Sequence, residues 1–123
     1  MRRVVITGMG IVSPLGDSAA EVLDALRQAR SGIRFHAPYR EIGLRAQLGG
    51  FTRVDVAARI DKKNLRFMGN AAAYAAIAMQ QAIDDAGLDE DEVSHPRTGL
   101  IIGSGGTSAE NVVATADTMR DKG

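Results

Sequence analysis

Two glycine-containing segments of this 123-residue sequence have residue types that could bind nucleotide phosphates. Gly8 and Gly10 follow an apolar run, which is how a dinucleotide-binding fingerprint begins. Residues 103–107 follow a second apolar run, as a phosphate-binding loop does. Both motifs need glycine because the backbone has to approach a phosphate at the amino end of the next helix.

The first segment departs from the dinucleotide-binding fingerprint. Ser13 stands in place of the third glycine, Pro14 follows it, and the next predicted helix begins only near Ser18. The acidic ribose ligand expected about 20 residues further on is also missing. We therefore predict that Gly8 and Gly10 serve close backbone packing in or beside a core strand, and we expect no cofactor.

The second segment lacks the Gly-Lys-Ser/Thr ending of a P-loop, so no lysine is placed to reach a phosphate. Two interpretations remain open from the residues alone. Residues 103–107 either form a tight strand-to-helix turn, or line a pocket in which small side chains leave room for an apolar ligand.

A basic cluster is the third feature that could bind a ligand or partner. Lys62, Lys63 and Arg66 stand at the predicted start of a long helix, where the helix dipole disfavours positive charge. A solvated surface explains most charge runs, but this unfavourable placement also indicates an anionic partner.

The composition argues against several other kinds of functional site and partner. The chain has no cysteine, which excludes a cysteine nucleophile and a thiolate metal site, and His36 and His95 are too far apart in sequence for metal-ligand spacing, so we predict no metal site. Fifteen basic residues balance fifteen acidic ones, which argues against general nucleic-acid binding. No apolar run suits a signal peptide or a membrane span, so we expect a cytoplasmic protein.

Apolar patterns and cap residues predict the elements that would position these features. Ser18 with Glu21, and Thr107 with Glu110, have capping-box spacing, while Gly87 is a typical helix stop. The predicted strands cover residues 3–7, 44–50 and 98–104, and the predicted helices cover 18–30, 63–86 and 107–120, with Gly32 as a stop after the first.

The long helix is unusual because its middle, AAAYAAIAM, is apolar on every face. Such a helix is expected to be buried on all sides. A domain of 123 residues can hardly surround it, so we expect the chain to be part of a larger body.

Taken together, four segments resemble the N-terminal part of the β-ketoacyl-acyl-carrier-protein synthases, which are condensing enzymes of the thiolase superfamily. Their order and spacing match along essentially the whole chain, and the details are most similar to the type I synthases. The segments are RRVVITGMGIVSPLG, LRQARSGI, DKKNLRFMGNAAAYAAIAMQQAIDDAGL and RTGLIIGSGG.

The resemblance implies an α/β chain that forms the N-terminal portion of a thiolase-like fold, with a mixed sheet and buried helices. Residues 1–123 would belong to the N-terminal half of the enzyme, with the rest absent. The parent protein would be a dimeric 3-oxoacyl-acyl-carrier-protein synthase of fatty-acid elongation. It would condense an acyl thioester with malonyl-acyl carrier protein and release CO2.

The resemblance also implies where the chemistry lies. The family's cysteine nucleophile and its two histidines would follow Gly123, so this segment alone is expected to be inactive. Lys62, Lys63 and Arg66 match the docking patch for acyl carrier protein. Gly106 and Thr107 match the loop at the acyl-chain pocket.

Two alternatives remain open from the sequence. One is a non-catalytic subunit that resembles a chain-length factor and shapes a pocket without a nucleophile. The other is a free-standing nucleotide-binding α/β protein, although the glycine segments argue against it.

Overall fold

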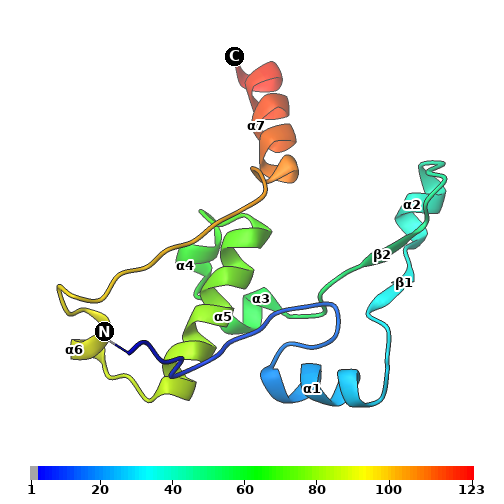
Figure 1. Cartoon of the computed structure of the whole chain (residues 1–123). Coiled ribbons are helices and arrows are strands. Elements are labelled where there is room, and N and C mark those ends of the chain that lie inside the picture. The colour runs from blue at the N-terminus through cyan, green and yellow to red at the C-terminus, as the bar shows by residue number, and fades with distance from the viewer. Residues whose placement is uncertain (1–2) are drawn as a thin grey trace.

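The computed structural model describes residues 3–123 and centres on one long helix, α5 (Figure 1). A small hairpin with a short helix projects to one side, and the last helix leads away from the amino end of α5 (Figure 1). The elements are α1 (Ala19–Arg27), β1 (Ile33–Phe35), α2 (Ala37–Glu41), β2 (Leu48–Gly50), α3 (Val56–Arg59), α4 (Lys62–Leu65), α5 (Asn70–Ala86), α6 (Glu90–Val93) and α7 (Ala109–Lys122).

The N-terminal segment packs directly on α5 through its glycines. A Cβ atom on Gly8 would lie 2.7 Å from the Ala86 nitrogen, and one on Gly10 would lie 2.7 Å from the Ala78 carbonyl carbon. Both distances are shorter than real Cβ contacts allow. The close backbone packing predicted for Gly8 and Gly10 is therefore confirmed, but the partner is a helix and not a core strand.

Side chains of α5 fasten the same segment by hydrogen bonds. The backbone N–H of Met9 donates to Asp85 Oδ2 at 2.9 Å, and that of Ile11 donates to Gln81 Oε1 at 3.0 Å. The Gln81 amide in turn donates to the Asp17 carbonyl oxygen at 2.7 Å. These contacts hold the chain that precedes α1 against the long helix.

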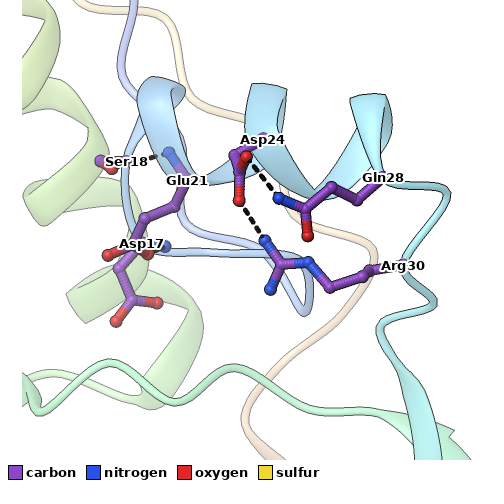
Figure 2. Close-up of polar contacts among 6 residues, drawn as sticks. All are labelled: Asp17, Ser18, Glu21, Asp24, Gln28 and Arg30. Carbon is purple, nitrogen blue, oxygen red and sulfur yellow. Dashed lines mark hydrogen bonds and ion pairs between the residues drawn. The ribbon is translucent and has the colours of Figure 1, made fainter.

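The start of α1 follows the predicted cap only in part. The Ser18 hydroxyl accepts a hydrogen bond from the Glu21 N–H at 3.3 Å, as expected for an N-cap. The Glu21 carboxylate accepts from the Asp17 N–H at 2.8 Å, so the reciprocal bond falls one residue before the cap (Figure 2).

The end of α1 lies earlier than predicted. The helix ends at Arg27, and Ala29 has a φ of 51°, in the left-handed region that glycine usually fills at this position. Gly32 is therefore not the stop. Asp24 holds the turn by accepting from Gln28 Nε2 at 2.8 Å and from Arg30 Nη2 at 2.6 Å (Figure 2).

The hairpin contains the one sheet within residues 3–123. Strands β1 and β2 run antiparallel, with Phe35 opposite Leu48. The predicted strand over residues 44–50 is confirmed in its last three residues. His36 stacks on the Phe51 ring at a centroid distance of 4.1 Å, which ties the end of β1 to the chain after β2.

The other two predicted strands, over residues 3–7 and 98–104, are wrong for this structure. No strand pairs with either segment among the described residues. Their apolar side chains face solvent, with Val4 93% and Ile101 98% exposed. An apolar sequence forms a strand only where a neighbouring strand accepts its backbone hydrogen bonds.

The long helix begins later than predicted and is not buried on all sides. It starts at Asn70, not at residue 63 or 64, and ends as predicted at Ala86 with Gly87 in the left-handed conformation at a φ of 66°. Only Ala73 and Ile77 are buried in it. The described residues therefore cover one part of α5 and leave its other apolar side chains partly exposed.

Candidate functional site

The basic cluster lies on a short helix of its own. Lys62 and Lys63 begin α4, and Arg66 caps its C-terminal end. All three side chains are exposed. Because α4 is separate from α5, the argument that these cations oppose the dipole of the long helix does not hold. Arg66 instead lies at a helix C-terminus, where positive charge is favourable.

Ion pairs do not neutralise the positive charge of the cluster within the described residues. The nearest carboxylate in sequence, that of Asp61, is the N-cap of α4 and accepts a hydrogen bond from the Lys63 backbone N–H at 2.7 Å. None of the three cations forms an ion pair within the described residues. The surface of α4 can therefore attract an anionic partner.

An aromatic ring accompanies the cluster. The Arg66 guanidinium carbon lies 4.5 Å from the centroid of the Phe67 ring, within the range of a cation–π contact. The Phe67 side chain is 77% exposed, and apolar patterning of the sequence did not single it out. Phe67 becomes a candidate binding residue only because it lies beside Arg66.

The glycine loop lies over a hollow between the first turns of α5 and α7. The hollow has a volume of about 740 Å³ and is lined by Asn70 and Ala72 of α5, Gly106 and Thr107 of the loop, and Asn111 of α7, among others. A Cβ atom on Gly106 would have no neighbour within 4 Å. The loop residue therefore faces open space, which suits a pocket wall better than a tightly packed turn.

The cap of α7 differs from the prediction by one residue. Ser108, not Thr107, is the N-cap, and its hydroxyl accepts from the Asn111 N–H at 3.3 Å. The Glu110 carboxylate is consequently not the partner of a capping box. Thr107 is left free to line the hollow.

The structure brings the two predicted sites to one end of α5. Gly69 caps the start of α5, three residues after Arg66, and a Cβ atom on it would lie 2.9 Å from Ser108 Cβ and 3.3 Å from Asn111 Nδ2. This contact joins the amino ends of α5 and α7. The basic cluster and the glycine loop therefore flank the same helix terminus (Figure 1).

The two histidines do not join this site. His36 lies in the hairpin against Phe51, and His95 Nδ1 accepts from the Arg97 N–H at 3.1 Å near α6. Across residues 3–123, no group of three or more His, Cys, Asp or Glu side chains is arranged to hold a metal ion. In the same range, no helix is both long and apolar enough to cross a membrane.

The fold and the site define an α/β chain with a charged surface and a glycine loop at one helix end. The family model for the beta-ketoacyl synthase N-terminal domain matches residues 1–123. The chain belongs to this family.

Relatives and a solved structure agree with that assignment. The chain is 47% identical over 120 residues to 3-oxoacyl-[acyl-carrier-protein] synthase 1 of Haemophilus influenzae, and 47% identical over 121 residues to that of Escherichia coli strain K12. The crystal structure of a beta-ketoacyl synthase from Burkholderia phymatum STM815 matches with a TM-score of 0.82 and 32% identity. The fold class implied by the resemblance, an α/β chain with a thiolase-like fold, is thereby confirmed.

The matches cover this chain almost fully but its relatives only in part. Each of the two synthases is covered over 30% of its length, with 98% of this chain aligned. The Burkholderia structure is covered over 31%, with 100% of this chain aligned. The chain thus spans about a third of the proteins that it resembles.

Proposed function

We propose that residues 1–123 are the N-terminal segment of an enzyme that condenses acyl thioesters with malonyl-acyl carrier protein in fatty-acid elongation. The segment belongs to the N-terminal half of that enzyme, which acts as a homodimer in the cytoplasm. The basic cluster of Lys62, Lys63 and Arg66 docks the acidic carrier protein. Gly106 and Thr107 line the pocket for the acyl chain.

One observation carries this proposal more than any other. The cluster and the glycine loop flank the amino end of α5, where Gly69 lies close to Ser108. A carrier protein docked on α4 would present its acyl group next to a hollow of about 740 Å³. The open space at Gly106 supports a pocket wall that accepts an alkyl chain.

The exposed surface supports the view that the chain belongs to a larger body. The chain exposes 10201 Å², roughly 3,900 Å² more than a compact monomer of its 13.0 kDa mass. Its unpaired apolar segments contribute to that excess, with Val4 and Ile101 almost fully exposed. The remainder of the enzyme would cover these segments and the exposed faces of α5.

The catalytic groups of the proposed reaction lie outside this segment. The chain has no cysteine to form the acyl thioester, and neither histidine lies near the glycine loop. The segment contributes a docking surface and part of a pocket, so we expect it to be inactive alone. A chain-length-factor-like subunit would share these features, and the residue at the nucleophile position of the complete protein separates the two functions.

Reversal of charge on α4 tests the docking role. In the complete protein, we expect Lys63→Glu with Arg66→Glu to raise the KM for carrier-borne substrate. The increase should be larger at low ionic strength, because exposed charges are screened by salt. Complementary charge mainly speeds encounter, so kcat should change much less.

A matched control reverses two cations elsewhere on the surface. Arg40 and Arg45 lie on and after α2 in the hairpin, far along the chain from α4, and both are exposed. Arg40→Glu with Arg45→Glu gives the same change in net charge, and we expect a smaller effect on KM. An unchanged KM in the α4 variant would refute the docking role.

A further inference from the structure

We infer that Phe67 is an apolar anchor of the docking surface on α4, and that it holds the Arg66 guanidinium ready to meet a carboxylate of the acidic carrier protein. This inference rests on the proposed function and adds a contact that charge alone does not provide. It assigns to one surface two kinds of interaction with different responses to salt.

The geometry of the pair is the first support. The Arg66 guanidinium carbon lies 4.5 Å from the Phe67 ring centroid, while the Phe67 side chain remains 77% exposed. A cation stacked on a ring has fewer conformations left to lose when it binds a carboxylate. The exposed remainder of the ring can contact apolar side chains of the same partner.

The surroundings of the pair are the second support. Lys62 and Lys63 precede it on α4, and the carboxylate of Asp61 is occupied with the helix cap. Arg59 ends α3, the short helix that contacts α4, and is also exposed. An aromatic residue among cations fits a partner that presents carboxylates beside an apolar side chain.

This combination is typical of residues that dominate binding energy. Aromatic residues and arginine are enriched among interface hot spots, where a central apolar contact is surrounded by polar groups. Rim charges by contrast mainly change association rate and salt dependence. The two contributions can therefore be separated by ionic strength.

The experiment compares three single variants of the complete protein at about 0.01 M and 0.15 M salt, where screening differs clearly. Phe67→Ala should raise the KM for carrier-borne substrate roughly five- to tenfold at both salt concentrations. Lys63→Glu should raise it more at the lower concentration. Phe67→Tyr keeps the ring and should restore a KM near that of the unmodified protein.

Two controls separate binding from folding. Phe35 carries a second arginine, Arg40, at 5.4 Å from its ring centroid in the hairpin, and Phe35→Ala should leave the KM unchanged. The same acyl group on a small thiol, without the carrier protein, should react equally well with Phe67→Ala. Loss of that small-thioester reaction would assign Phe67 a structural role and overturn the inference.

The remaining outcomes distinguish the inference from the function on which it rests. If Lys63→Glu raises the KM and Phe67→Ala does not, docking stands and the anchor is refuted. If neither variant changes the KM, the docking surface is not on α4 and both proposals fail. A Phe67→Ala effect that disappears at the higher salt concentration would also contradict an apolar anchor.

Discussion

Replacement of Gly10 by alanine tests the contact that fixes the N-terminal segment on α5. The added Cβ atom would lie 2.7 Å from the Ala78 carbonyl carbon and 2.9 Å from Gln81 Cβ, and would overlap the Ala78 carbonyl oxygen. The obstacle is helix backbone, which cannot rotate away as the end of a side chain can. Either the segment moves outward or α5 is distorted.

The expected cost follows from three contributions. Overpacking of a close contact costs about 1–3 kcal/mol. Outward movement would also break the bond from the Ile11 N–H to Gln81 Oε1, for a net loss of about 0.5–1.5 kcal/mol. Alanine reduces the freedom of the unfolded chain and returns about 0.4–1 kcal/mol. We expect the free energy of unfolding to fall by about 2–3 kcal/mol.

The measurement is a urea titration of the protein and its variant, followed by circular dichroism. Gly99→Ala is the matched control, because a Cβ atom there has no neighbour within 4 Å and its φ lies outside the left-handed region. This control should be as stable as the unmodified protein, or slightly more so. The packing argument is refuted if Gly10→Ala is no less stable than Gly99→Ala.

Two further predictions concern the end of α1 and the glycine loop. Ala29 has a φ of 51°, so Ala29→Gly should raise the free energy of unfolding by about 0.5–1 kcal/mol in the same titration. A free energy of unfolding that falls by the same amount would show that the turn is unstrained. Gly106 has room for a side chain, so Gly106→Met in the complete protein should shift its products to shorter acyl chains without loss of fold. A product distribution identical to that of the unmodified protein would remove the pocket assignment.

Local signals in the sequence predicted two of the helix ends correctly. Ser18 and Gly87 act as predicted at the start of α1 and the end of α5, because caps depend on a few neighbouring residues. The start of α5 was misplaced because the predicted helix is interrupted: α4 ends at Leu65, and Gly69 has an extended backbone as the N-cap of α5. Gly69 also lies against Ser108. That contact joins residues far apart in sequence.

Strands were predicted less well because they depend on distant partners. Residues 3–7 have a suitable β-branched, apolar composition, yet no strand within the described range 3–123 pairs with them, and Val5 is 74% exposed. Leu48 pairs with Phe35 across a hairpin, at a separation of 13 residues in the sequence. A periodic pattern shows which residues avoid water but not which surface covers them.

The candidate site was predictable in its residues but not in its assembly. Charge and glycine patterns single out the cluster on α4 and the loop around Gly106, and the resemblance supplies their roles, whereas their common position at one end of α5 required coordinates. The role proposed for Phe67 also required coordinates, since neither its exposure nor its position beside the Arg66 guanidinium follows from sequence pattern.

The most direct measurement of the central proposal is a condensation assay of the complete protein beside the segment 1–123. Each is given acyl-carrier and malonyl-carrier thioesters, and both the 3-oxoacyl product and CO2 are quantified. We predict that the complete protein forms both products and that the segment forms neither. Condensation by the segment alone, or none by the complete protein, would contradict the proposed function.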